Sequence, residues 1–221
     1  MKSSTPVRDL TVTAREGLDG NWGKSIGVMA AYLILLVGVR LVPFAGRLLE
    51  LIFAAPLTVG MTVYLLATVR KQSNPFSLLF SGFDRFGTSL CTYLLIMLIM
   101  LIWMIPFGVV TAVLFFAFHV TSPLIWALLI LTMIAVMIPI QMRYSLALYV
   151  VADDPSVRAR QAVRRGIELM KGNYGRLGML WLRFVGWQLF GILTLGISFI
   201  WLAPYFMASI TVFYDDLTTN G

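Results

Sequence analysis

Cysteine and histidine are almost absent from this 221-residue sequence, which holds one of each, Cys91 and His119. A single cysteine excludes an internal disulfide and any metal site built from several cysteines. We expect Cys91 to be a small packing residue within a membrane helix. His119 falls in a short turn between apolar runs and is expected to be a surface residue. No metal ion or other cofactor is therefore expected.

The sequence also lacks the motifs of common enzymes. It has no His-Glu-x-x-His pair, no Gly-x-Ser-x-Gly elbow, no Walker loop and no dinucleotide fingerprint. Of its 10 acidic residues only Glu50 approaches an apolar run, with Arg47 three residues before it as the expected ion-pair partner. The lack of charge deep in the apolar runs argues against ion-coupled transport. We expect a protein that is not an enzyme and has no catalytic site.

Apolar residues are what the sequence has in excess, at 59% hydrophobic and 12% charged. In soluble domains about half of the residues are hydrophobic and about a quarter are charged. A membrane-spanning helix needs about 20 apolar residues. Six runs are long enough to be predicted spans of an all-α polytopic membrane protein: 26–42, 51–69, 90–118, 124–151, 177–193 and 197–214. The third and fourth runs exceed the bilayer, so this hairpin must tilt, kink at Pro106 or, as we expect, protrude inward.

The charge distribution predicts an orientation. Short turns follow the first, third and fifth runs, and only Arg40 and Arg47 lie on that side. Nearly all other Lys and Arg residues lie on the opposite side, so the positive-inside rule places both termini in the cytoplasm. The first 25 residues contain no apolar core of the signal-peptide type. The net charge of +7 is explained by this asymmetry, and no binding to nucleic acid is expected.

A repeated pentapeptide divides the chain. GNWGK at 20–24 and GNYGR at 172–176 each precede an apolar run, and DRFG at 84–87 is a degenerate third copy. Each copy follows a short segment with helical periodicity. We interpret the single domain, 1–221, as a pseudo-threefold repeat with units 5–73, 74–153 and 154–217. Each unit would contain an amphipathic interfacial helix and a transmembrane hairpin.

The pentapeptides are interpreted as hinges between the interfacial helix and the membrane. The aromatic residue would anchor at the interface, the glycine would allow the corner, and the asparagine side chain would cap the next helix. The predicted hinge residues are Asn21, Trp22, Gly23, Phe86, Gly87, Asn173, Tyr174 and Gly175.

Each outgoing helix carries a proline: Pro56, Pro139 and Pro204. One interpretation is a set of kinked helices around a central polar spot, as in transporters with broken helices. The other is that these prolines only set helix curvature for packing.

The third interfacial helix is the most basic. Its polar face carries Arg158, Arg160, Arg164, Arg165 and Lys171. These residues could contact anionic lipid headgroups, or they could only fix the topology.

Several longer segments resemble a known family. LDGNWGKSIG, YSLALYVVADDP, the stretch from ELMKGNYGRLG to IWLAPY, and TVFYDDL together resemble a bacterial integral-membrane family catalogued as domain of unknown function 975. The sequence departs from it at Leu148, where the family is expected to have proline, and in its longer middle hairpin. The resemblance implies a multi-pass protein of the bacterial plasma membrane and implies no established activity.

Three functions follow as hypotheses. The first is a non-enzymatic membrane protein that binds lipids, or partner membrane proteins, through its basic cytoplasmic helices. The second is a transporter or protective, immunity-type protein that handles a small amphiphile or membrane-active peptide between the kinked hairpins. The third is an intramembrane enzyme, for which the sequence offers no catalytic constellation.

Overall fold

The computed structural model describes residues 5–119, 121–194, 196 and 198–219. This part of the chain is all-helical, with no β-strand in the described residues. The elements, in chain order, are α1 (Val7–Leu18), α2 (Trp22–Arg40), α3 (Gly46–Val69), the 3₁₀-helix η1 (Phe76–Phe83), α4 (Phe86–Phe116), α5 (Pro123–Tyr144), α6 (Ala147–Asp153), α7 (Ala159–Met170), α8 (Tyr174–Leu193) and α9 (Phe199–Thr219).

Four helical segments of the described chain are long and apolar enough to cross a membrane. They are α2, α3, α4 and the segment Pro123–Asp153, which comprises α5 and α6. The fifth and sixth predicted spans form α8 and α9, which are not among these four; α8 carries Arg176 and Arg183, and α9 carries Asp215 and Asp216 near its end. Val120, Leu195 and Ile197, which belong to the predicted turns and the start of the sixth span, lie outside the described residues.

The fourth predicted span is not one continuous helix. α5 ends at Tyr144, and α6 begins only at Ala147. The hydroxyl of Ser145 donates to the carbonyl of Met142 at this break. α6 then packs against α7, where a side chain on Gly166 would collide with the backbone of Ala147. The expected inward extension is thus made by two helices, and α6 packs closely against α7.

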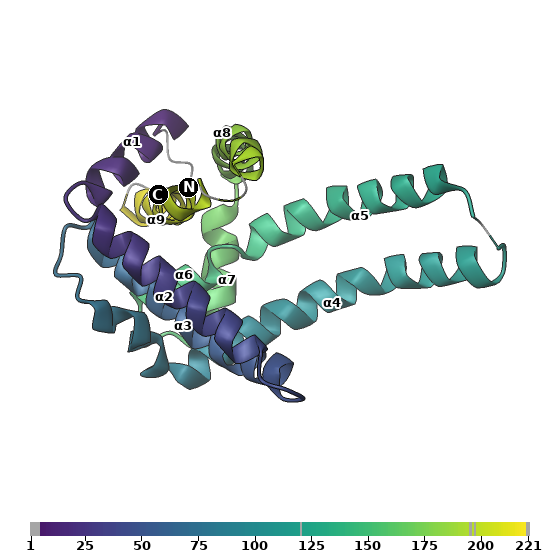
Figure 1. Ribbon diagram of the computed structural model, residues 1–221, viewed down its shortest axis with the longest axis horizontal. Helices are drawn as coiled ribbons and strands as arrows, with labels where there is room; N and C mark the ends of the chain where they lie inside the picture. The colour runs from purple at the N-terminus through teal and green to yellow at the C-terminus, as the bar shows by residue number, and fades with distance from the viewer. Residues whose placement is uncertain (1–4, 120, 195, 197, 220–221) are drawn as a thin grey trace.

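The short helices pack in a cyclic order. η1 lies against α3, and α7 lies against α6. α1 lies against α9, where the Tyr205 hydroxyl donates to the Thr11 carbonyl (Figure 1). Each short helix thus covers a helix that precedes it in the chain, except α1, which covers the last helix and closes the cycle.

Part of the apolar face of each short helix is buried within the protein. Leu10, Ala14 and Leu18 of α1 are at most 1% exposed, and Leu79 of η1 and Met170 of α7 are fully buried. These residues join the main core cluster of the protein. They are covered by other helices and are not free to enter the acyl region of a bilayer.

The pentapeptide glycines that shape the chain are Gly20 and Gly172. Their φ angles are 79° and 82°, and they follow Asp19 and Lys171 with φ near −60° and ψ of 131° and 120°. The backbone N–H of Asn21 donates to the Leu18 carbonyl, and the backbone N–H of Asn173 donates to the Met170 carbonyl. Both corners are therefore type II turns, which require positive φ at the third residue and so favour glycine.

The predicted corner glycines lie elsewhere. Gly23, Gly87 and Gly175 are inside the first turn of α2, α4 and α8, and a Cβ there would meet nothing within 4 Å. The prediction that they form the corners is wrong, because the turns are completed before these helices begin. At DRFG, Asp84 takes an αR conformation in place of the left-handed glycine.

The asparagines do not cap the following helices with their side chains. Neither Asn21 nor Asn173 makes a side-chain cap hydrogen bond. Instead, Nδ2 of Asn173 donates to the Leu169 carbonyl at the end of α7. The backbone carbonyls of both asparagines accept the first bonds of their helices, from Ser25 and Leu177.

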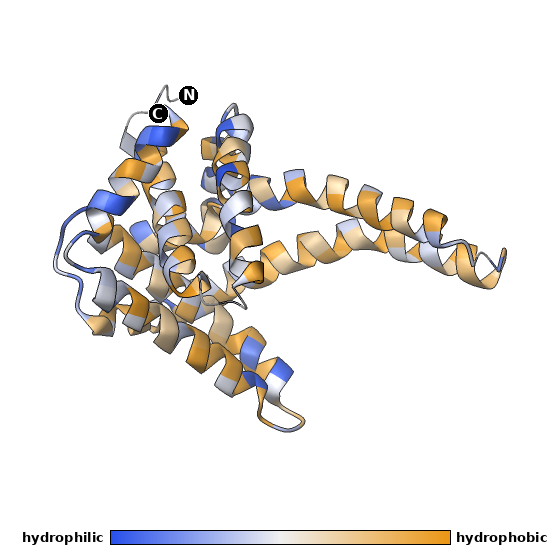
Figure 2. Ribbon diagram, turned by 45° about the horizontal axis from the view of Figure 1, so that its top comes forward, coloured by the Kyte–Doolittle hydropathy of each residue, from blue (hydrophilic) through white to orange (hydrophobic). Residues whose placement is uncertain are grey.

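The α4–α5 hairpin extends away from the other helices (Figure 1). It is mostly apolar along its length (Figure 2), yet most of its large side chains are exposed, and so is Cys91 on α4. The expectation that Cys91 packs inside the protein is wrong, because this side of α4 has no neighbour in the described chain. The core instead centres on α3, which α2, η1, α6 and α9 surround.

Candidate functional site

An ionic cluster joins the ends of three helices. Arg70, directly after α3, pairs with Asp153 at the end of α6 at 2.6 Å and with Asp215 of α9 at 2.7 Å. The Tyr214 hydroxyl donates to the second oxygen of Asp153 at 3.2 Å. The bonds from Arg70 to Asp153 and Asp215 raise the pKa of Arg70 above its ordinary value, and the bond to Asp153 has the largest effect. The cluster fixes three chain segments to one another and presents no free catalytic group.

A second ion pair connects the chain termini. Arg176, the last residue of GNYGR, donates to Asp216 at 2.8 Å and to the Thr5 carbonyl at 2.7 Å. Its guanidinium lies 5.5 Å from the ring centre of Phe213. Asp216 also accepts a bond from the Thr5 hydroxyl. Because the Arg176 and Asp216 side chains are only 14% and 7% exposed, this contact is a structural anchor.

Arg85 makes a related structural contact with the end of α6. Its Nη1 donates to the carbonyls of Val151 at 2.7 Å and Ala152 at 2.9 Å. These carbonyls belong to the last turn of α6, where a cation is favourable because helix C-terminal carbonyls lack partners.

The five predicted basic residues of α7 and its ends are all exposed. Two of them are paired, Arg164 with Glu168 at 3.0 Å and Arg165 with Asp154 at 2.7 Å. No ion pair in the described part of the chain involves the others, Arg158, Arg160 and Lys171. α7 therefore presents unpaired positive charge on the face opposite to its buried residues.

Asp154 links this helix to α6. Its carboxylate accepts bonds from the Ser156 hydroxyl and amide and from Arg165. These bonds lower the pKa of Asp154 to about 2, and the bond from the Ser156 hydroxyl has the largest effect. The inner side of α7 borders a hollow of about 520 Å³ that contains Asp153, Asp154, Glu168 and Arg165. Its acidic lining makes it unsuitable for an anionic headgroup.

The predicted hinge aromatics have separate surroundings. Trp22 lies 6.3 Å from Tyr205 between ring centres and donates to Asp19. Phe86 stacks on Phe83 at 6.5 Å, and Tyr174 is half-buried. The three do not form one site.

The three prolines also differ in their surroundings. Pro56 and Pro204 are buried inside α3 and α9, whereas Pro139 lies on an exposed face of α5. The structure therefore does not give them a common environment around one central spot.

At the other end of the first hairpin, Glu50 pairs with Arg40 at 3.7 Å. The predicted partner, Arg47, borders the same small hollow, of about 280 Å³, without pairing with Glu50. The α2–α3 turn brings Arg40 back over α3, which spacing along one helix could not predict.

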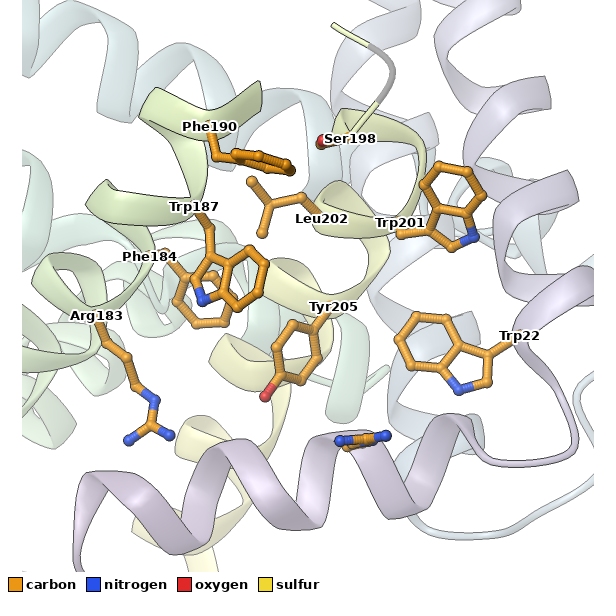
Figure 3. A pocket seen from close by; sticks show the side chains of 10 residues that line it. Trp22, Arg183, Phe184, Trp187, Phe190, Ser198, Trp201, Leu202 and Tyr205 are labelled. Atoms are coloured by element: carbon orange, nitrogen blue, oxygen red, sulfur yellow. The ribbon is translucent and has the colours of Figure 1, made fainter. Parts of the chain in front are cut away.

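An aromatic cavity of about 510 Å³ lies between α1, the start of α2, α8 and α9. Its aromatic rings come from α8, from α9 and from Trp22, and arginines of α1 and α8 border it (Figure 3). It is lined by Arg15, Trp22, Arg183, Phe184, Trp187, Phe190, Ser198, Trp201, Leu202 and Tyr205.

Sequence reasoning missed this cavity. Arg183, Trp187 and Phe190 are spaced i, i+4 and i+7 and so share one face of α8. That spacing was the available signal. The contribution of α1 could not be found in the same way, because it depends on the closing contact between α1 and α9.

The described residues contain no group of three histidine, cysteine, aspartate or glutamate side chains that could hold a metal ion. Together the fold and these sites define an all-helical protein with four segments able to cross a membrane.

The chain belongs to the family described as protein of unknown function DUF975, whose profile matches residues 1–221. No curated protein and no solved structure matches it.

Proposed function

We propose that the chain is a non-enzymatic, multi-pass protein of a bacterial plasma membrane that binds anionic lipids through the exposed basic surface of α7. The observation that carries this proposal is the presence of exposed cations without ion-pair partners in the described chain on α7 and at its two ends: Arg158, Arg160 and Lys171. Near an anionic membrane each such residue contributes up to about 1 kcal/mol.

In this proposal the six apolar runs span the membrane as three hairpins related by a pseudo-threefold repeat. The cyclic packing of α1, η1 and α7 supports it. The residues before α2, α4 and α8 also share one backbone conformation, with φ of −121°, −116° and −112°. Such similarity is expected when one structural unit is used three times.

Both termini lie on the same side in this proposal, which is the cytoplasmic side. The bonds from Thr5 and Arg176 to Asp216 support the shared side, because they hold the two ends of the chain together. The cytoplasmic assignment follows from the excess of Lys and Arg there. α7 would then face the anionic inner leaflet.

The transporter hypothesis gains less support. It needs kinks that converge on one path, and Pro139 is exposed on the separate α4–α5 hairpin. The amphiphile part of that hypothesis has a better basis in the aromatic cavity between α8, α9 and α1.

The test neutralises only the unpaired cations of α7 and its ends, as Arg158→Gln, Arg160→Gln and Lys171→Gln together, so that the Arg165–Asp154 pair remains. The protein is extracted from membranes with equal phosphatidylglycerol and phosphatidylcholine, and native mass spectrometry counts the lipids retained. We expect the wild type to be enriched in phosphatidylglycerol at low salt and the variant to lose most of this enrichment.

The matched control is Arg40→Gln with Arg47→Gln at the opposite membrane side, which should keep the enrichment. Equal enrichment in the α7 variant would overturn the proposal. Loss of a co-purifying membrane protein, with unchanged lipid, would instead favour a protein partner.

A further inference from the structure

We propose that the cavity between α1, α2, α8 and α9 binds one molecule of an anionic phospholipid. Its phosphate would lie at Arg15 and Arg183, and one acyl chain would lie along Trp187 and Phe190. This inference rests on the proposed membrane location of the chain, but not on the basic surface of α7.

The two arginines provide the argument for an anion. Arg15 and Arg183 border the same cavity, and no acidic residue lines it. Neither arginine takes part in an ion pair within the described chain. The nearby Asp19 accepts a bond from the indole of Trp22. An anion with several acceptor oxygens would accept charge-assisted hydrogen bonds from both guanidinium groups.

The aromatic side chains provide the argument for an acyl chain. Trp187, Phe190 and Trp201 are 58%, 51% and 52% exposed, so they are not core residues of the chain itself. Phe190 follows Arg183 by seven residues, which corresponds to about 10 Å along a helix. Arg183 and Phe190 therefore mark two ends of the cavity (Figure 3). A polar end and an apolar end match the two parts of a phospholipid.

The size of the cavity fits part of such a ligand. Sites for small ligands measure about 300–1,000 Å³, and this cavity has about 510 Å³. It is partly open, so the second acyl chain would remain in the bilayer. An aromatic cavity could also attract a quaternary ammonium group, but Arg15 and Arg183 would repel that cation. A zwitterionic lipid should therefore bind more weakly than an anionic one.

The experiment measures quenching of tryptophan fluorescence by phospholipids with brominated acyl chains. Trp103 and Trp126, on the α4–α5 hairpin, are first replaced by phenylalanine so that they do not report on bulk lipid. Brominated phosphatidylglycerol and phosphatidylcholine are then titrated into the full-length protein in a neutral detergent. We expect half-maximal quenching by phosphatidylglycerol at a concentration at least fivefold lower than by phosphatidylcholine.

In this background Arg15→Gln with Arg183→Gln should abolish the fivefold preference. The Arg158→Gln, Arg160→Gln, Lys171→Gln variant should retain it, which separates this site from the α7 surface. Arg183→Lys keeps the charge and should retain a partial preference. Circular dichroism and gel filtration establish that each variant is folded.

Equal quenching by both lipids in the wild type would overturn the inference, as would a preference that survives in the Arg15/Arg183 variant. Glycerol phosphate is added as a competitor. We expect it to displace phosphatidylglycerol only weakly, and displacement at the lipid's own concentration would show a site for soluble anions and contradict a role for the acyl chain.

Discussion

The most apolar helices of this protein are its least buried ones. In the most apolar window of α3, 72% of the residues are buried within the protein, whereas in the corresponding windows of α4 and the α5–α6 segment, which have higher hydropathy, no residue is buried. The difference shows that hydropathy alone does not select the core. α3 is buried because small residues let other backbones approach it, and because Arg70 at its end joins α6 and α9.

The exposed hairpin therefore needs a covering that the described chain does not supply. Exposed apolar area of this extent is atypical of a soluble monomer, and it is normal for a surface that faces lipid. The protein thus consists of a packed body and an apolar hairpin that extends from it (Figure 2).

The largest expected effect comes from Gly60→Ala in α3. A Cβ at this position would collide with the backbone carbonyl of Leu79 in η1. Overpacking against backbone cannot be relieved by a rotamer change, so we expect the free energy of unfolding to fall by about 3 kcal/mol. Thermal unfolding in detergent, followed by circular dichroism, measures it.

Gly108→Ala in α4 is the matched control. A Cβ there meets nothing within 4 Å, and alanine is the better helix former by about 0.5–1 kcal/mol. Unfolding should be unchanged or shifted upward. Equal destabilisation by both substitutions would remove the distinction between the packed body and the hairpin.

A polar residue on the hairpin should affect insertion instead of packing. Ile102 on α4 is 55% exposed, and arginine near the centre of a spanning helix costs about 2.5–3.5 kcal/mol in translocon-mediated insertion. We expect Ile102→Arg to reduce the inserted fraction of the α4–α5 hairpin in a glycosylation-mapping assay, whereas Ile102→Leu should not. If arginine is inserted as efficiently as leucine, this face of α4 does not meet lipid.

The smallest effect is expected from Arg70→Gln. It removes both ion pairs and leaves Asp153 and Asp215 without their shared cation. Since the Arg70 side chain is 30% exposed, solvent screening limits the loss of stability to about 1 kcal/mol. Chemical denaturation at low and high salt should show a difference that shrinks with salt.

Arg40→Gln, which breaks the longer and more exposed pair with Glu50, serves as its control and should change stability by less. A larger loss for Arg40→Gln would mean that the ionic cluster does not hold the packed body together.

Much of the helical arrangement could be predicted from the sequence. The predicted runs 26–42 and 51–69 correspond to α2 and α3 within a few residues, because a long apolar run is a local property. The break between α5 and α6 could not be predicted, since MRYSLALYVV contains neither glycine nor proline. It accompanies the close approach of Gly166 to Ala147, which are 19 positions apart in the chain.

The sites were predictable to a smaller degree. The basic residues of α7 are exposed as helical periodicity suggests, and three of them are unpaired in the described chain. The turn glycines were within reach, because Gly20 and Gly172 occupy the position that a type II turn reserves for glycine. The aromatic cavity could not be predicted, since α1 and α2 on one side of it are remote in sequence from α8 and α9 on the other.

The sequence by itself determined the all-helical class, the apolar segments and the low content of metal-binding residues, because composition and periodicity act over a few neighbouring positions. Only the tertiary structure decided that α3 is covered while α4 is exposed, that Arg176 binds Asp216, and that Arg15 and Arg183 share a cavity. These features depend on distances between residues far apart in the chain, and such distances exist only after the helices have packed.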